Sequence, residues 1–148
     1  MRIRGLIVKQ PYVSMLARGE KRWEIRRYPT SIRGPVALIS RGWLYGFAEL
    51  IDVFPMEVKR LHRYSHMHRA PREELEKYAA GLEKLYVWVF VNPLPLPKPV
   101  KVTYARGAQV WAFLDADEVL SAMRREGLTR EVVKATRMLR RASRWRRR

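Results

Sequence analysis

The segment GEKRWEIRR, from Gly19 to Arg27, carries the residues whose types and spacing point most directly to chemistry. Its alternation is typical of a β-strand, although Lys and Glu are depleted in strands. The alternation places Arg22, Glu24 and Arg26 on one face. An arginine can bind a carboxylate through two parallel hydrogen bonds. Glu24 is therefore expected either to fix the strand to its surroundings or to accept a hydrogen bond from the amino group of a nucleobase in a cleft.

Lys21, three residues before Glu24, adds another role for the same segment. The alternating pattern places Lys21 on the opposite face, with Trp23. A lysine and a glutamate close together can serve as general acid and base, so Lys21 and Glu24 are the catalytic candidates if the chain is an enzyme. A neighbouring carboxylate keeps the amine charged, however, and this suits anion binding better than nucleophilic attack.

Cationic and aromatic residues are interleaved along the first third of the chain. Single-stranded nucleic acid is held by cations that contact phosphates and by aromatic faces on which bases stack. Tyr12 and Tyr28 flank turns and are the better stacking candidates, whereas Trp23 and Trp43 are more typical of a core. The predicted nucleic-acid-binding residues of this region are Lys9, Tyr12, Lys21, Arg22, Glu24, Arg26, Arg27, Tyr28, Arg33 and Arg41.

The overall charge favours a polyanionic partner. The 148 residues include 31 Lys and Arg against 14 Asp and Glu, which gives a formal net charge of +17 and a pI near 11.0. A pI above about 9 is typical of nucleic-acid-binding domains. We therefore expect a nucleic acid, RNA or DNA, as the partner and no membrane.

About half of the positive excess lies in the last fifth of the chain. Residues 121–148 contain 11 basic and 2 acidic residues, a net charge of +9, and residues 1–120 account for the remaining +8. This tail either neutralises phosphates, so that binding weakens steeply with salt, or forms a solvated helix face, or meets an acidic partner. The predicted apolar stripe of its last helix is Val132, Val133, Thr136 and Leu139, and its predicted nucleic-acid-binding residues are Arg137, Arg140, Arg141 and Arg144.

Composition removes several functional classes. The absence of cysteine excludes disulfides, thiol catalysis and cysteine-ligated metals. His62, His66 and His68 lie close together, but their spacing gives a third ligand no defined geometry, so no metal and no cofactor is expected. No apolar run approaches the roughly 18 residues of a membrane helix, and the N-terminal apolar run is shorter than that of a signal peptide. We expect a soluble, cytoplasmic protein, and the scarcity of Asn and Gln is typical of a thermophile.

The elements that must position these residues are short and of mixed type. Strands are predicted at 3–8, 21–27, 35–40, 43–54, 85–91 and 106–115, and helices at 11–18, within 55–81, at 116–126 and at 129–148. Gly46 is expected to mark a bulge or bend, and the four prolines between Asn92 and Val100 predict a stiff extended connection or an edge segment. Strands mixed with short helices, without regular alternation, favour an α+β fold built on a small, mostly antiparallel barrel.

These motifs, taken in order, resemble the ASCH domain of the PUA-like superfamily. The similarity is carried by the strand and proline-led helix around Lys9–Pro11, the G-x-K-x-x-E-x-R signature at Gly19–Arg26, the R-G-P turn at Arg33–Pro35, and the strands at Tyr86–Val91 and Gly107–Trp111. The resemblance implies a small, mostly antiparallel PUA-like β-barrel over residues 1–115, with short surrounding helices and a cleft beside the signature strand. Residues 116–148 lie outside the resemblance and are expected to form a basic extension of two C-terminal helices packed on or beside this barrel.

The resemblance also implies a function. The superfamily is known for RNA binding, so the first hypothesis is an RNA-binding protein that holds RNA or a nucleotide in a basic cleft beside the signature strand. Some similar small proteins are enzymes, an amidohydrolase acting on N4-acetylated cytidine and ribonucleases, so a small nucleic-acid enzyme is the alternative. Toward the amidohydrolase, Lys21 matches its lysine, Glu24 stands in place of its threonine, and Glu73 or Glu74 would supply its acid.

Overall fold

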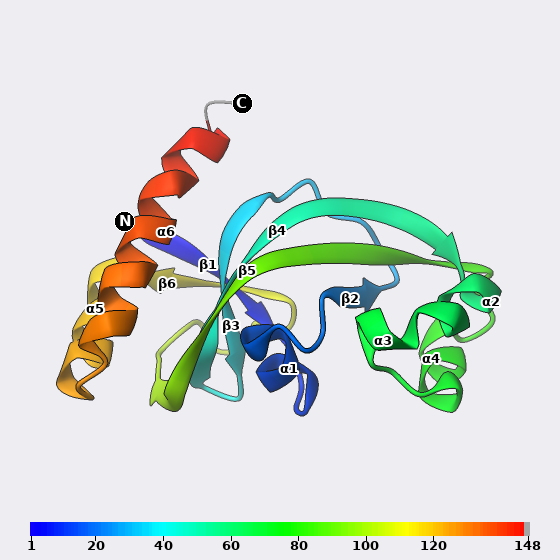
Figure 1. The fold of residues 1–148 in the computed structure, drawn as a ribbon, viewed down its shortest axis with the longest axis horizontal. Coiled ribbons are helices and arrows are strands. Elements are labelled where there is room, and N and C mark those ends of the chain that lie inside the picture. Colours follow the sequence, from blue (N-terminus) through cyan, green and yellow to red (C-terminus); the bar gives the residue numbers. More distant parts are fainter. Residues whose placement is uncertain (147–148) are drawn as a thin grey trace.

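A six-stranded sheet flanked by helices forms the core of the molecule, as a computed structural model shows (Figure 1). The structure describes residues 1–146, with side chains described through residue 142. The strands are β1 (Arg2–Ile7), β2 (Trp23–Arg26), β3 (Gly34–Ser40), β4 (Trp43–Glu57), β5 (Lys84–Lys101) and β6 (Trp111–Asp115). The helices are α1 (Tyr12–Arg18), α2 (Val58–Leu61), the 3₁₀ helix η1 (His62–Tyr64), α3 (Ser65–His68), α4 (Arg72–Ala79), α5 (Ala116–Arg125) and α6 (Thr129–Arg146).

The strands follow the order β2-β5-β4-β3-β1-β6 across the sheet. β1 pairs with β3 in parallel, and the other four pairings are antiparallel. The predicted α+β, mostly antiparallel fold is therefore confirmed. Parallel neighbours need a crossover connection, and here the segment containing α1 and β2 supplies it. This crossover carries the signature segment across the open side of the sheet.

Side chains, rather than backbone hydrogen bonds, connect the β2–β5 side of the curved sheet to its β1–β6 side. Within the described residues, β2 and β6 do not pair with each other, so the barrel is open along this line. Trp88 of β5 stacks on Trp111 of β6, with ring centroids 5.8 Å apart. Arg26 of β2 donates a hydrogen bond to the carbonyl oxygen of Ile7 at the end of β1. The opening between β2 and β1 is therefore spanned by polar side chains and is the natural place for a site.

The long β4–β5 hairpin bends at Gly46. The pairing register shifts between Leu44 and Gly46 on both sides of β4, which confirms the predicted bulge. The proline-rich segment, predicted as a connection or an edge segment, continues β5 as a strand to Lys101. Proline cannot donate to a ladder, but β2 pairs only with the first part of β5, up to Val89. The other side of the proline segment is thus left without a strand neighbour, and proline is tolerated there.

The two C-terminal helices pack against the same core as the strands. Buried side chains of α5 and α6 contact β1, β3, β4 and β6 in one apolar cluster. The predicted stripe on α6 is corrected in part: Val133 is exposed, whereas Ala135 and Met138 join Val132 and Leu139 in the core. No helix in the described part of the chain has the length and apolar character needed to cross a bilayer.

Two helical segments flank the opening between β1 and β2. The first is α1, which ends at Arg18, as the predicted range did, and is followed by Gly19 in a left-handed conformation. The second comprises α2, η1, α3 and α4, inserted between β4 and β5 at the far end of the hairpin (Figure 1). A buried apolar cluster that includes Ile25, Leu61 and Leu75 holds this insert against β2 and β5. The insert therefore forms one fixed wall of the opening.

Gly46 offers a direct test of the packing between β4, α1 and β5. A Cβ atom at this position would clash with the carbonyl oxygen of Leu94 and lie 3.0 Å from the Cβ of Ala17. We expect Gly46→Ala to lower the free energy of unfolding by about 3 kcal/mol, because overpacking against backbone forces both neighbours to shift. Urea denaturation followed by circular dichroism measures this change.

Gly42→Ala is the matched control, because nothing lies within 4 Å of a Cβ at Gly42 and only its positive φ of 86° opposes the substitution. That strain costs about 1 kcal/mol. Equal losses in the two variants would contradict tight packing at Gly46.

Candidate functional site

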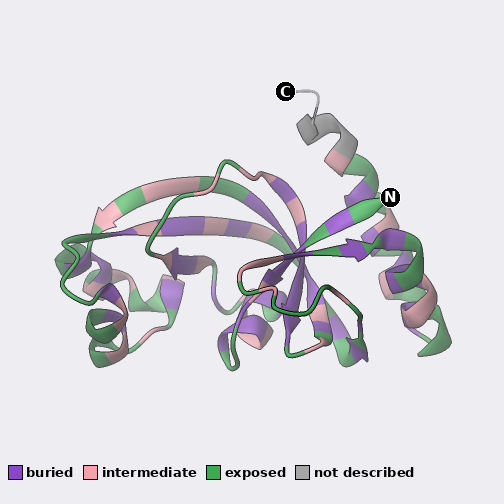
Figure 2. Cartoon of the chain, turned by 180° about the vertical axis from the view of Figure 1, so that it is seen from behind, coloured by how far each residue is buried: buried purple, intermediate pink, exposed green. Residues whose placement is uncertain are grey.

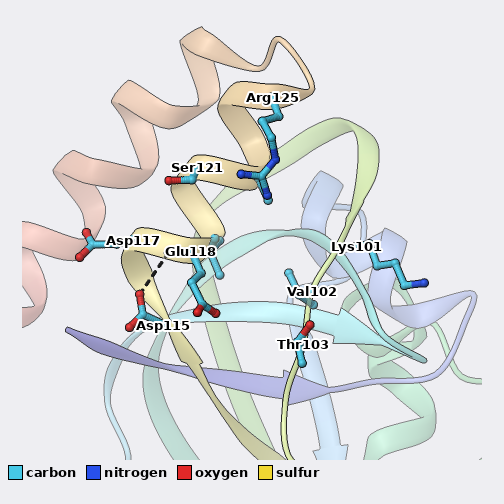
Figure 3. A pocket seen from close by; sticks show the side chains of 10 residues that line it. Lys101, Val102, Thr103, Asp115, Asp117, Glu118, Ser121 and Arg125 are labelled. Carbon is cyan, nitrogen blue, oxygen red and sulfur yellow. Dashed lines mark hydrogen bonds between the residues drawn. The ribbon is translucent and has the colours of Figure 1, made fainter.

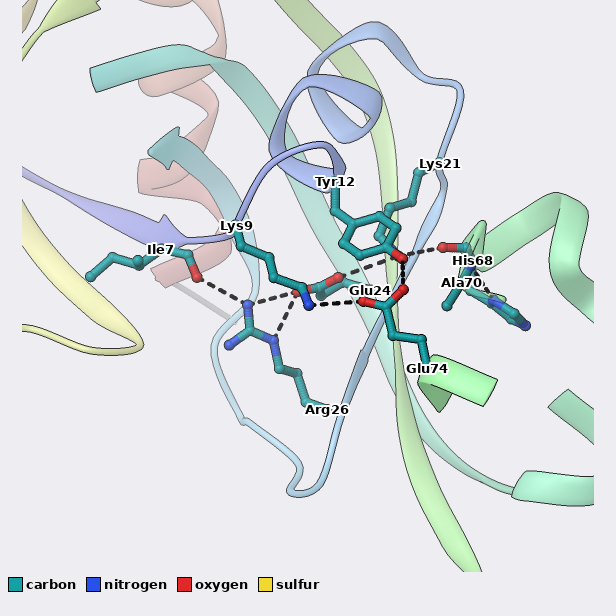
Figure 4. Close-up of polar contacts among 9 residues, drawn as sticks. All are labelled: Ile7, Lys9, Tyr12, Lys21, Glu24, Arg26, His68, Ala70 and Glu74. Carbon is teal, nitrogen blue, oxygen red and sulfur yellow. Dashed lines mark hydrogen bonds and ion pairs between the residues drawn. The ribbon is translucent and has the colours of Figure 1, made fainter. Parts of the chain in front are cut away.

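The centre of the site is the carboxylate of Glu24 on β2, which is buried between two cations (Figure 4). Lys21 Nζ lies 3.3 Å from Glu24 Oε1, and the side chain of Lys21 is only 3% exposed. The Nε and Nη2 atoms of Arg26 both donate to Glu24 Oε2, at 2.9 and 2.7 Å. Arg26 therefore binds only one carboxylate oxygen of Glu24. The other oxygen, Oε1, has the longer contact with Lys21 Nζ. This oxygen retains capacity to accept a further hydrogen bond.

Lys21 reaches Glu24 because β2 begins only at Trp23. The alternating pattern predicted Lys21 on the face of Trp23, but Lys21 precedes the strand, so strand alternation does not govern its side chain. Its Nζ donates to the carbonyl oxygen of His68 at 2.6 Å and lies 4.8 Å from the centre of the Tyr12 ring. Lys21 thus connects β2 to the insert from behind Tyr12.

A second carboxylate, Glu74 of α4, faces the same space (Figure 4). It accepts hydrogen bonds from the Tyr12 hydroxyl and from Lys9 Nζ, the latter at 2.8 Å. Lys9 follows β1 and Tyr12 opens α1, so these contacts join the N-terminal segment to the insert. The side chain of Lys9 is 70% exposed and that of Glu74 38%, so solvent screens their ion pair and it is easily exchanged for another partner.

These groups border a cleft of about 710 Å³ between β1, β2 and α4. Arg27 and Tyr78 form part of its rim: Arg27 Nε donates to the Tyr78 carbonyl oxygen at 2.7 Å, and the guanidinium lies 4.5 Å from the Tyr78 ring centre. Lys77 and Gln109 complete the polar lining. Four cations and two carboxylates line the cleft, so its net charge is positive.

A comparison with protein-family models matches residues 6–100 to the ASCH domain. The chain belongs to the ASCH domain family. Among solved structures, ASCH from Zymomonas mobilis is 18% identical, with 78% of this chain and 90% of that chain covered and a TM-score of 0.66. Two single-substitution variants of that protein, also 18% identical, cover 80% of this chain with TM-scores of 0.67 and 0.66, and 94% and 92% of their own chains. At this identity the similarity shows the fold, and a comparison with functionally curated proteins gives no match.

Lys21, Glu24 and Arg26 form a buried trio of charged side chains, and the carboxylate of this trio has a defined charge state. Burial would raise the pKa of Glu24, but Lys21 and Arg26 outweigh burial and lower it. Burial lowers the pKa of Lys21, while Glu24 opposes this effect. Burial also acts to lower the pKa of Arg26, and the charge of Glu24 reverses this and raises it. Glu24 is therefore ionised at neutral pH and acts only as a hydrogen-bond acceptor.

Glu74, the more exposed carboxylate of the cleft, is ionised as well. Hydrogen bonds from Lys9 and then from Tyr12 lower the pKa of Glu74. Burial and the hydrogen bond to Glu74 raise the pKa of Tyr12, which keeps its hydroxyl protonated as a donor. A carboxylate with a lowered pKa accepts a proton less readily near pH 7. Glu74 is thus better suited to orienting a ligand or a cation than to general-base catalysis.

The predicted binding residues divide between this cleft and other surfaces. The cleft brings together Lys9, Tyr12, Glu24, Arg26 and Arg27, with Lys21 behind them. Tyr28 lies beside it, with its exposed ring edge-on to Trp88 at a centroid distance of 6.3 Å. This group supports the predicted grouping of cations and aromatic rings around the signature strand.

Arg22, Arg33 and Arg41 lie elsewhere. Arg22 precedes β2 and borders a separate hollow near Pro93, so it does not share the surroundings of Glu24 as the alternation predicted. Arg33 lies in a hollow beside β1 and α6. Arg41 occupies the tight turn between β3 and β4, with a positive φ of 48°.

The predicted residues of the basic tail lie on α6, away from the cleft. Arg141 binds the buried carboxylate of Glu49 on β4 at 2.9 Å, so it helps to fasten α6 to the sheet. Arg137 and Arg140 are exposed on the same helix. The side chain of Arg144 lies outside the described residues.

Sequence reasoning missed several residues of the cleft. Glu74 entered only through the family resemblance, beside Glu73, and the structure places Glu74 in the cleft and Glu73 at the surface. Tyr78 was not predicted, although residues four apart on a helix share a face, so a candidate at Glu74 would have indicated it. Gln109 precedes β6 and carries no local signal. Its place depends on the pairing of β6 with β1.

Of the three clustered histidines, the buried His68 has a structural role. His68 is fully buried, its Nε2 donates to the Leu61 carbonyl oxygen at 2.7 Å, and its Nδ1 accepts from the Ala70 amide at 3.0 Å. Burial lowers its pKa, which favours this neutral form. His62 instead contacts Glu76 at 2.7 Å. Among the described residues, no group of three His, Cys, Asp or Glu side chains is arranged to hold a metal ion.

A hollow beside α5 differs from the cleft in its charge (Figure 3). Asp115, Asp117 and Glu118 line it with only two cations, Lys101 and Arg125. Asp115 accepts a hydrogen bond from the Glu118 amide and caps α5. Excess negative charge repels a polyanion, so the cleft beside β2 is the better candidate site.

The buried trio can be tested by removing the charge of Glu24. We expect Glu24→Gln to lower the free energy of unfolding at pH 7 by about 3 kcal/mol, because Lys21 and Arg26 would be left buried without their anion. The pKa of Glu24 is lowered in the folded state, so its contribution is present above the unfolded pKa of about 4.3 and is lost as pH falls through the folded value. Urea denaturation at pH 7 and pH 3 should therefore show a smaller difference between variant and wild type at pH 3.

Glu20→Gln is the control, since Glu20 pairs with Arg18 at the surface. Exposed pairs contribute about 0–1 kcal/mol. A loss in Glu24→Gln no larger than in this control would show that the trio is not buried as described.

Proposed function

We propose that this ASCH domain binds single-stranded RNA, with one nucleotide held in the cleft beside β2. The observation that carries the proposal is the charge arrangement of the cleft: a buried carboxylate at its base and exposed cations at its rim. The volume of about 710 Å³ falls within the range of small-ligand sites, about 300–1,000 Å³. Such a hollow suits an unstacked base with its sugar rather than a duplex.

The base of the cleft offers groups that can read a nucleobase. Glu24 Oε1 has one contact at 3.3 Å and can accept from an exocyclic amino group. Gln109 supplies both a donor and an acceptor. Tyr12 and Tyr78 also line the cleft, and stacking on aromatic rings is how single-stranded RNA is usually held.

The rim of the cleft offers cations for the phosphate backbone. Lys9 and Lys77 are exposed, and Lys9 is restrained by its screened pair with Glu74 and by the Tyr12 ring 5.7 Å away. Arg27 is also exposed, and its contacts with Tyr78 hold its guanidinium at the cleft. Neutralising phosphates here would release counterions and make binding sensitive to salt. The net charge of +17 would also accelerate association with any polyanion.

Charge removal at the rim tests this proposal. Anisotropy of a labelled single-stranded RNA pool at low salt should show binding by the wild type, and a Lys9→Gln/Lys77→Gln variant should bind about tenfold more weakly with a salt slope lower by about 1.4. DNA of the same sequences, measured in parallel, shows whether the ribose hydroxyl contributes.

Lys59→Gln/Arg60→Gln is the control, because it removes the same charge from exposed positions on α2 outside the cleft. Absence of RNA binding by the wild type, or equal weakening in both variants, would overturn the proposal.

Hydrolysis of a modified nucleoside is the second function that the site suggests, because Lys21, Glu24 and Glu74 gather around one cleft. The geometry favours it less. The side chain of Lys21 is buried and already donates to the carbonyl oxygen of His68. Glu24 stays ionised between its two cations. Both side chains are therefore better placed to organise the cleft than to attack a substrate.

A turnover assay separates the two functions. We expect no release of cytidine from N4-acetylcytidine and no cleavage of a long RNA, measured by chromatography and gel electrophoresis, under conditions in which the RNA is bound. Turnover by the wild type that is lost in Glu74→Gln and in Lys21→Ala would instead establish the enzyme.

A further inference from the structure

The hollow that contains Arg33 has a volume of about 590 Å³ and lies at the opposite end of β1 from the cleft beside β2. It is bordered by the start of β1, by the loop before β3, by Phe113 of β6 and by Leu139 of α6. Figures 1 and 2 both place the N-terminal strand beside α6. The helix lies beyond the residues matched to the ASCH domain, so this hollow depends on the C-terminal extension.

Two arginines of this hollow are held over an aromatic ring. Arg4 is paired directly opposite Phe113 in the β1–β6 register, and Arg2 lies two residues away on the same face. Their guanidinium carbons lie 4.4 Å (Arg2) and 5.0 Å (Arg4) from the centre of the Phe113 ring. A guanidinium over a ring is restrained by the cation–π interaction while its N–H groups remain available at the edge. Both arginines are thus positioned for an anion before one arrives.

The third arginine, Arg33, is oriented by the backbone. Its Nη1 donates to the carbonyl oxygens of Thr30 and Ile32, both at 2.8 Å. These contacts use the two hydrogens of Nη1, and a guanidinium has three further N–H donors on Nη2 and Nε. Those donors are the ones free to meet a phosphate.

Among the described residues, these three charges have no carboxylate in direct contact. None of the described residues lining the hollow is acidic, and no described carboxylate forms an ion pair with Arg2, Arg4 or Arg33. Asp115, opposite Arg2 in the register, instead accepts from the Glu118 amide as the cap of α5. Three like charges without an anion repel one another, and a bound phosphate would relieve that repulsion.

We propose that this hollow is a second contact site for the phosphodiester backbone of the same RNA strand. β1 separates the two sites by about 17 Å, five residues at roughly 3.3 Å each. The loop of residues 27–33 joins them, with Arg27 at the cleft and Arg33 at the hollow. A stacked strand covers that distance with about five nucleotides at roughly 3.4 Å each. An RNA of three nucleotides occupies one site only, whereas one of twelve reaches both.

Oligonucleotide length tests the second site, which rests on the proposed RNA binding for its choice of ligand. Calorimetric titration of the full chain with a 12-nucleotide RNA should show binding about tenfold weaker in Arg2→Gln/Arg4→Gln, with a salt slope lower by about 1.4. Binding of a trinucleotide should be unchanged in that variant and weakened in Lys9→Gln/Lys77→Gln. Arg2→Lys/Arg4→Lys keeps the charge without the planar guanidinium and should lose only part of the affinity.

The outcomes separate the two proposals. Unchanged 12-nucleotide binding in Arg2→Gln/Arg4→Gln, a loss no larger than in the α2 control Lys59→Gln/Arg60→Gln, or an equal loss with the trinucleotide would each overturn the second site and leave the cleft standing. A wild type that binds neither RNA would overturn both. Weakening by Arg2→Gln/Arg4→Gln without any effect of Lys9→Gln/Lys77→Gln would support the second site and refute the cleft. Arg2 and Arg4 are both exposed, so replacing them does not disturb the core.

Discussion

A buried carboxylate between two buried cations is the interaction on which the geometry of this ASCH domain depends. Taking Lys21, Glu24 and Arg26 out of water is expensive, and apolar side chains in their place would often stabilise a fold as well or better. The contribution of these three side chains is therefore to connect parts of the fold. Lys21 donates to the carbonyl oxygen of His68 in the insert, and Arg26 donates to that of Ile7 at the end of β1. Glu24 is thus the common partner of groups that fix two walls of the cleft.

Much of the fold follows from patterns that a sequence displays. Alternating and apolar runs predicted the strands, and Gly46 predicted the bulge in β4. The continuation of β5 through four prolines was not predicted as a strand, because proline propensity says nothing about which side of a strand has a neighbour. Likewise, the buried stripe of α6 depends on how the helix docks, which placed Ala135 rather than Val133 in the core.

The site was predictable to the extent that its residues lie close in sequence. Glu24 and Arg26 share a strand, so alternation brought them together, and the signature motif pointed to Lys21. Alternation failed at Lys21 and Arg22 because the strand begins after both. Contacts that span more than 60 residues, such as Tyr12 with Glu74, have no local signal, and they arise from the insertion of the helical segment beside β1 and β2. The tail shows the same limit: its charge suggested phosphates, solvent or an acidic partner, yet Arg141 pairs with Glu49, a buried glutamate of the sheet.

The tie between Lys21 and the His68 carbonyl oxygen also bears on how a ligand would be received. Because this bond and the Arg26 bond to Ile7 hold the walls in place, an entering molecule would meet a receptor that is already shaped. Little free energy would then be consumed in ordering loops on association, and the largest rearrangement would be the release of Lys9 from Glu74 at the rim. Among related ligands, discrimination in such a preorganised receptor is expressed mainly in residence time rather than in the rate of encounter.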